Sequence, residues 1–77
     1  MPVYFFDIND GSGWVRDNEG SSLENALAAK REATETLAQI GTELFPGLDG
    51  HALNADVRTE DGAVILRVSI SLCVTTA

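Results

Sequence analysis

The N-terminal proline is a residue whose chemistry could support catalysis. If Met1 is removed, Pro2 becomes a secondary amine, and burial would lower its pKa into the range of a general base. A proline at the edge of a strand is the simpler interpretation and is preferred.

Side chains with oxygen ligands cluster at the end of the first apolar run, at Asp7, Asn9 and Asp10. These residue types can bind calcium, but an EF-hand loop requires Gly at its sixth position and Glu at its twelfth. Counted from Asp7, those positions hold Ser12 and Asn18. Because Asp, Asn and Gly are also the common turn formers, the segment is interpreted as a turn.

The remaining candidates are single residues. His51 stands near Asp49 in a Gly-containing segment, but the chain has no serine in a Gly-x-Ser-x-Gly elbow. Cys73 is the only cysteine, so no intrachain disulfide can form, and we expect an idle thiol. No catalytic, metal or cofactor site is therefore predicted, and the protein is expected not to be an enzyme.

Two strands are expected before the helix. Residues Val3 to Ile8 are aromatic and β-branched, and a shorter strand is expected from Trp14 to Asp17. In a hairpin whose turn is centred on Asp10 and Gly11, residues at equal distances before and after the turn lie opposite each other. That register places Val15 opposite Phe6, Arg16 opposite Phe5 and Trp14 opposite Asp7.

A helix is expected to follow, beginning with a capping box between Ser21 and Glu24 and continuing to Phe45. Pro46 and Gly47 end it. Apolar residues recur at spacings of three and four and predict the buried face, at Leu23, Ala26, Leu27, Ala33, Leu37, Ile40 and Leu44.

The last third of the chain predicts a second hairpin. Leu53, Ala55 and Val57 alternate with polar residues, and so do the apolar residues from Val64 to Leu72. A two-residue turn at positions 61–62 predicts three apolar pairs and one opposite-charge pair: Val57–Leu66, Ala55–Val68, Leu53–Ile70 and Asp56–Arg67.

Together these elements predict an α+β fold of the order ββαββ. One helix would pack on one face of a four-stranded antiparallel or mixed sheet, in a single domain spanning residues 1–77. Val3 and Phe5 fall on the opposite side of the first strand from Tyr4, Phe6 and Ile8. Either this strand is central, or its outer side meets another chain. The outward residues form the candidate interface, namely Val3, Phe5, Trp14, Arg16 and Ile65.

Composition excludes several classes of partner. With 5 basic and 12 acidic residues, the chain lacks the clustered Lys and Arg of a nucleic-acid-binding surface, and it is not expected to dock on an anionic membrane. The start of the chain does not have the pattern of a signal peptide, so a cytoplasmic location is expected. A second copy of the chain or a basic protein is the expected partner.

Several motifs resemble known families. The opening Pro2-Val3-Tyr4-Phe5-Phe6-Asp7, the segment from Leu44 to Gly47 and the final hairpin together resemble a family of short bacterial proteins catalogued as a domain of unknown function. That resemblance covers nearly the whole chain and implies no activity. Gly13-Trp14-Val15 and the segment from Ser22 to Leu27 are similar to the HicB-like antitoxin domain, which implies binding of a basic toxin. The N-terminal proline resembles the 4-oxalocrotonate tautomerase family. That resemblance implies an acidic substrate bound by arginines, for which Arg16 and Arg58 are the candidates, but the formal net charge of −7 repels such a substrate.

Three functions stay open from the sequence. A non-catalytic interaction or dimerisation module is preferred, and a HicB-like antitoxin module and a small N-terminal-proline tautomerase are the alternatives.

Overall fold

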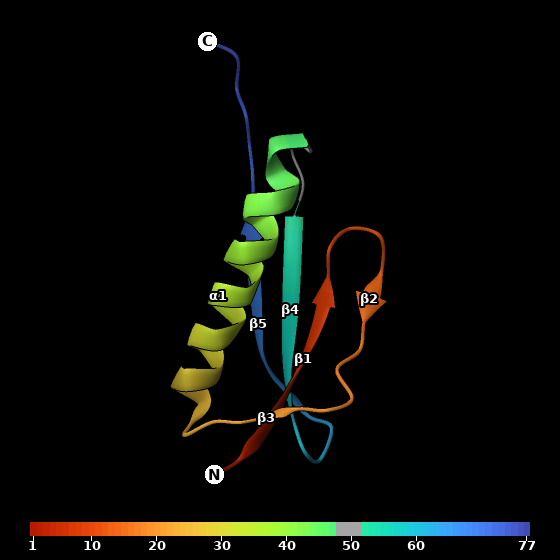
Figure 1. Ribbon diagram of the computed structural model, residues 1–77, viewed down its shortest axis with the longest axis vertical. Helices are drawn as coiled ribbons and strands as arrows, with labels where there is room; N and C mark the ends of the chain where they lie inside the picture. The colour runs from red at the N-terminus through yellow and green to blue at the C-terminus, as the bar shows by residue number, and fades with distance from the viewer. Residues whose placement is uncertain (48–51) are drawn as a thin grey trace.

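The computed structural model describes residues 1–47 and 52–77 and has one helix packed on an antiparallel sheet (Figure 1). This arrangement confirms the predicted α+β class. The elements in chain order are β1 (Val3–Asn9), β2 (Trp14–Val15), β3 (Ser21–Ser22), α1 (Ala26–Leu44), a 3₁₀ turn (Phe45–Gly47), β4 (Ala52–Thr59) and β5 (Val64–Ser71).

The sheet has the order β2-β1-β4-β5, and β3 pairs with β1 on the same edge as β2. β1 is therefore a central strand, with β4 on its other side. Both edges of β1 are thus paired, and on its outer face Val3 and Phe5 lie against Gly20 of the segment between β2 and β3. β5 is an edge strand, and among the described residues only β4 pairs with it.

The first hairpin differs from the predicted register by two residues. Ile8 rather than Phe6 is opposite Val15, and Asn9 is opposite Trp14. The reason is a four-residue loop in place of the two-residue turn. Within it, Asn9 Oδ1 accepts the Gly11 N–H at 2.8 Å, and Gly11 and Gly13 have φ of 100° and 140°. The predicted pairs of Phe5 with Arg16 and of Asp7 with Trp14 are therefore wrong, and β2 ends at Val15.

The predicted capping box is also wrong. Ser21 belongs to β3 and lies opposite Tyr4, and the Leu23 N–H extends that pairing to the Pro2 carbonyl at 3.0 Å. Because the sheet uses this backbone, the helix starts later, with Asn25 as its N-cap. The Asn25 side chain accepts the Ala28 N–H at 2.9 Å. The helix ends at Leu44, one residue before the predicted end.

The core lies between α1 and the strands β4 and β5. Small residues at Ala29, Ala33 and Gly41 let the helix approach the sheet closely, and Leu37 fills the centre. Leu27 was predicted to be buried but is 63% exposed, because it lies two residues before Ala29 and therefore on the opposite side of the helix from the buried stripe. The strands contribute the rest of the buried apolar residues, which are Tyr4, Leu53, Ala55 and Val57.

The second hairpin confirms the predicted register over most of its length, including the Asp56–Arg67 pair. Its turn is longer than predicted. The Thr59 N–H donates to the Ala63 carbonyl at 2.9 Å, which leaves three residues in the loop, and Gly62 there has a φ of 88°. A bulge opposite Val57 and Arg58 absorbs the added residue. Consequently Val64, predicted to face the core, is 55% exposed.

Candidate interface

An aspartate replaces a missing strand segment beside β1. Between the stretches of β1 that pair with β2 and β3, the Phe6 N–H donates to Asp17 Oδ2 at 3.1 Å. The other oxygen of Asp17 accepts the N–H groups of Glu19 and Gly20 at 3.0 and 3.1 Å. The segment between β2 and β3 is thus held against the edge of β1 by one carboxylate.

Arg58 of β4 joins this segment to the outer face of the sheet. Its Nε lies 2.7 Å from Asp7 Oδ2 and its Nη2 lies 3.1 Å from Asp7 Oδ1, which is bidentate pairing. Nη2 also donates to the Asp17 carbonyl at 2.8 Å, and the Asp17 N–H donates to Asp7 Oδ1 at 3.0 Å. The Arg58 guanidinium lies over the Phe5 ring, 4.9 Å from its centroid. We call Asp7, Asp17 and Arg58 the polar network.

Both carboxylates of the polar network have lowered pKa values. Hydrogen bonds from Arg58 lower the pKa of Asp7 against the opposing effect of burial. Burial by itself raises the pKa of Asp17, but N–H donation from Phe6, Gly20 and Glu19 outweighs it, so that this pKa is lowered as well. Both groups are therefore ionised at neutral pH and serve the folded structure. A general base poised near pH 7 would need a raised pKa.

Two like charges lie directly opposite each other on the outer face. Asp7 of β1 is paired in register with Asp56 of β4, an arrangement that is unfavourable on its own. Each carboxylate has its own arginine, since Arg67 of β5 binds Asp56 at 2.6 and 2.8 Å. Arg67 also lies 5.7 Å from the Trp14 ring centroid. The outer face thus carries two arginines, each between a carboxylate and an aromatic ring.

The structure separates the five residues predicted for the interface. Val3 and Phe5 lie side by side and half-buried against Gly20, where an added Cβ would be 2.7 Å from Val3 Cγ1 and 2.9 Å from Phe5 Cε1. Trp14 is 49% exposed beside Arg67. Arg16 is exposed near the polar network, and its charge contributes to the lowered pKa of Asp7. Ile65 is 41% exposed in the bulge of β5, on the other side of β4 from β1.

The polar network was missed by sequence reasoning. Asp7 and Arg58 are 51 positions apart, and their contact follows only once β1 and β4 are known to be neighbours. The alternation of each strand does place both side chains on the outer face. That signal becomes useful when the strand order is known.

The other candidates for chemistry are dispersed. Pro2 is exposed at the start of the sheet, where its carbonyl accepts the Leu23 N–H. Cys73 is exposed after β5. Asp49 and His51 lie outside the described residues. Within residues 1–47 and 52–77, no group of three or more His, Cys, Asp or Glu side chains could hold a metal ion.

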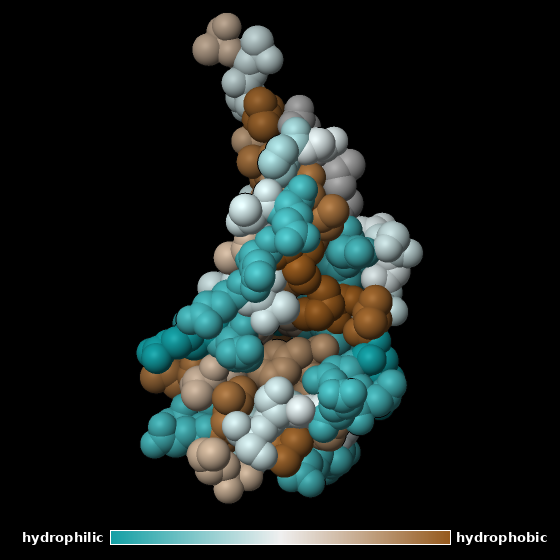
Figure 2. Space-filling view, viewed as in Figure 1, coloured by the Kyte–Doolittle hydropathy of each residue, from teal (hydrophilic) through white to brown (hydrophobic). Residues whose placement is uncertain are grey.

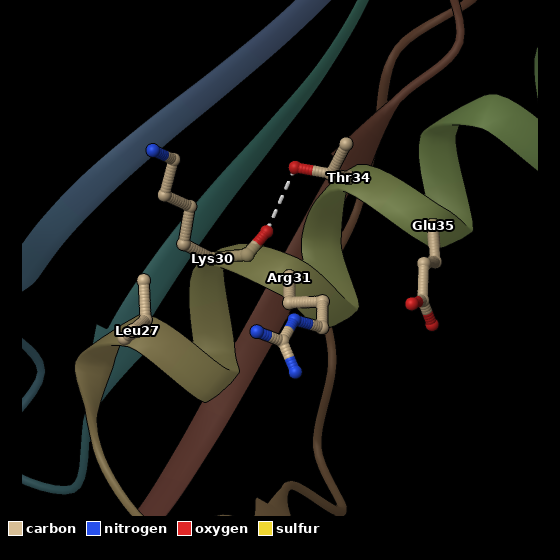
Figure 3. A pocket seen from close by; sticks show the side chains of 5 residues that line it. All are labelled: Leu27, Lys30, Arg31, Thr34 and Glu35. Atoms are coloured by element: carbon tan, nitrogen blue, oxygen red, sulfur yellow. Dashed lines mark hydrogen bonds between the residues drawn. The ribbon is translucent and has the colours of Figure 1, made fainter.

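The described residues line open hollows on the surface. One is lined on α1 by Leu27, Lys30, Arg31, Thr34 and Glu35. Figure 3 shows that its side chains diverge, with Lys30 and Arg31 on different sides of the helix, while Thr34 Oγ1 donates to the Lys30 carbonyl at 2.8 Å. A ligand would find no converging polar groups there.

The second hollow is lined by residues of β1, of β2 and of the segment that follows β2. Figure 2 shows an apolar patch between α1 and the β1–β2 hairpin. Phe6, Ile8 and Val15 supply its apolar lining, and Arg16 and Glu19 are among its charged residues. Because α1 packs mainly on β4 and β5, this part of the helix-facing side of β1 is only partly covered.

The free edge of β5 is the other uncovered surface. Between Leu66 and Ser71 every second residue of β5 is exposed. This segment contains neither a proline nor a bulge. An edge strand presents unpaired N–H and carbonyl groups, which pair readily with another strand.

Among the described residues, no helix is long and apolar enough to cross a membrane.

Comparison with known proteins gives a family but no activity. No curated protein and no solved structure matches the chain. The family model described as Domain of unknown function (DUF6894) matches residues 3–71, which span both hairpins and the helix. This match covers nearly all of the chain, and the protein therefore belongs to the DUF6894 family.

Proposed function

We propose that the chain is a non-catalytic interaction module that binds a second copy of itself through the part of the sheet next to β5. The observation that carries this proposal is the combination of an unpaired edge strand with exposed apolar residues beside it. Val64 and Ile65 are 55% and 41% exposed at one end of β5. Burial of such residues is worth roughly 25 cal/mol per Å² of apolar area.

The condition of the polar network supports a structural role rather than catalysis. Its carboxylates and guanidinium bind one another and the backbone, and every buried side-chain nitrogen or oxygen among the described residues has a partner. A small domain also gains stability from association with a second copy, because a chain of this length buries a modest core.

Binding of a basic protein, as in a HicB-like antitoxin, is the second candidate. The net charge of −7 favours a basic partner, and the hollow lined by Phe6, Ile8 and Val15 offers an apolar surface with Glu19 beside it. The tautomerase alternative, the bacterial origin and the cytoplasmic location stay predictions.

The test is the oligomeric state of matched variants. Light scattering behind a sizing column should give the mass of a dimer for the unmodified chain at high concentration. Ile65→Ser should weaken the dimer, while Val15→Ser, which truncates a residue 68% exposed on the far side of the sheet, should leave it unchanged. A monomer at every concentration would refute self-association, and weakening by Val15→Ser alone would place the contact elsewhere.

A further inference from the structure

We propose that the two copies join strand to strand along β5, in an antiparallel register that places Ser69 of one chain opposite Ser69 of the other. This inference rests on the proposed function and adds the pairing surface, the symmetry and the register. It follows from the directions of backbone groups across the sheet.

The direction of each N–H group can be traced from β1. Phe6 donates away from β4, to Asp17, and the Pro2 carbonyl also points to that side. In an antiparallel ladder the residues of a strand point alternately to one neighbour and to the other. Asp7 therefore points to β4, and its partner Asp56 points back to β1.

The same alternation carries the pattern to the free edge. Ala55 and Val57 of β4 point to β5, where they pair with Val68 and Leu66. The remaining residues of β5 therefore direct their N–H and carbonyl groups away from β4, into the free edge. In the regular part of the strand they are Arg67, Ser69 and Ser71, whose side chains also face outward.

A two-fold axis perpendicular to the sheet is the symmetry that fits two identical antiparallel edges. It keeps the same face of both copies toward the helices, so the apolar residues of β5 meet apolar residues. The bulge beside Ile65 disrupts the edge at one end, which confines regular pairing to the stretch after it.

Four registers satisfy this symmetry near the middle of the strand. An axis at Ile70 would pair Arg67 with Cys73, which lies beyond the end of β5. An axis at Arg67 would place two arginines directly opposite each other, which is unfavourable. An axis at Val68 would pair Ser71 with the bulged Ile65. An axis at Ser69 pairs Ser69 with Ser69 and Arg67 with Ser71, and uses all three free residues of the regular stretch.

The register with Ser69 on the axis also suits the side chains. On the helix-facing side it places Val68 opposite Ile70 of the second copy, a pair of β-branched residues. On the outer face, serine hydroxyls meet at the axis, and the two arginines are separated along the strands. Both copies of α1 lie on the same face of the joined sheet.

Single cysteines on the edge test the register. In a Cys73→Ser background, Ser69→Cys should form a disulfide between two chains under mild oxidation, because directly opposite residues have Cα atoms about 5.5 Å apart. Arg67→Cys and Ser71→Cys are the matched controls. Each would be about 13 Å along the strand from its own copy, beyond the reach of a disulfide of roughly 7 Å.

The predicted result is at least tenfold faster cross-linking of Ser69→Cys than of either control, with equal rates in denaturant. Faster cross-linking of Arg67→Cys, or equal rates for all three folded variants, would overturn the register. If the unmodified chain is a dimer and Ser69→Cys does not cross-link, this inference fails while self-association stands. If the chain is a monomer throughout, both fail.

A proline substitution tests the edge without cysteine chemistry. The Ser69 N–H points away from β4, so Ser69→Pro removes a group that only the second copy would use. Ser69→Ala is the matched control, because both substitutions lose the Ser69 hydroxyl bond to Asn54 at 2.6 Å. The proline variant should be a folded monomer by circular dichroism and light scattering, and the alanine variant a dimer. A dimeric, folded proline variant would contradict pairing at this edge.

Discussion

Replacement of Asp17 by alanine is the sharpest test of the way in which the β2–β3 segment is held. The carboxylate accepts three backbone N–H groups, from Phe6, Glu19 and Gly20. Glu19 is exposed, so water can replace its bond. Phe6 and Gly20 are half-buried, and the loss of their acceptor is costly.

The magnitude follows from those two bonds. A hydrogen bond to a charged group contributes roughly 1.5–3 kcal/mol, and partial access of water reduces each value. We therefore expect Asp17→Ala to lower the free energy of unfolding by about 2–4 kcal/mol. A domain of this length has a stability of roughly 4–12 kcal/mol, so the variant should still fold at room temperature.

Urea unfolding followed by circular dichroism at 222 nm, at one fixed protein concentration, measures this change. Asp17→Asn is the matched control. It retains one oxygen but places an amide donor at the position of the other, so its loss should be about half as large. Amide hydrogen exchange adds a local readout, since the Phe6 N–H should lose protection in the alanine variant. A loss below about 0.5 kcal/mol, together with unchanged Phe6 exchange, would refute the assigned role.

Further predictions concern pH, two local contacts and salt. The pKa values of Asp7 and Asp17 are lowered in the folded state, so their ionised forms stabilise the fold fully above the ordinary carboxyl pKa of about 3.9. This stabilisation is lost as pH falls through the lowered values, and unfolding by urea should become easier below about pH 4. Unchanged stability there would contradict the role of the polar network. Gly20→Ala should destabilise the fold more than Gly62→Ala. Both glycines have positive φ, of 75° and 88°, but only the Cβ added at Gly20 would lie close to Val3 and Phe5, whereas the one at Gly62 would meet nothing within 4 Å. Equal losses of stability in urea unfolding would show that the packing contact contributes nothing. Asn25→Ala should cost about 1 kcal/mol through loss of the helix cap, measured against the exposed control Asn18→Ala in the same unfolding assay. Because each chain carries a net charge of −7, raising the salt concentration from about 50 to 500 mM should strengthen self-association in light scattering, and weakening would indicate an attractive charge contact instead.

The second hairpin shows what the sequence could predict. Its apolar and polar residues alternate over both strands, and a shift of one residue would turn Leu53, Ala55 and Val57 to solvent. The length of the turn between β4 and β5 could not be predicted, for a physical reason. A two-residue turn and a three-residue turn followed by a bulge keep the same register beyond the bulge, so the pattern of Leu66 and Val68 cannot distinguish them.

The first half of the chain was harder to predict because its signals compete. Asn, Asp and Gly between the first two strands permit turns of several lengths, and the hydrogen bond from Gly11 to Asn9 selects a four-residue loop. Ser21 and Glu24 have the spacing of a capping box, yet pairing with Tyr4 draws Ser21 into the sheet. A local sequence pattern cannot decide between two turn lengths, or between a helix cap and a strand, when the partner strand is distant in sequence.

The candidate interface shows the same limit. Alternation correctly placed Val3 and Phe5 together on the outer side of β1, but the strand order was needed to see that Ile65 lies beyond β4. The contact between Asp7 and Arg58 depends on that order as well. The edge of β5 could be identified only after β4 was found to separate it from β1.

The mass of the unmodified chain in solution is the most direct test of self-association. Light scattering behind a sizing column should be carried out with a reductant present, so that the exposed Cys73 cannot cross-link the chains. We predict a mass near twice the 8.2 kDa of one chain at high concentration, falling toward 8.2 kDa on dilution. A mass of 8.2 kDa at every concentration would contradict it.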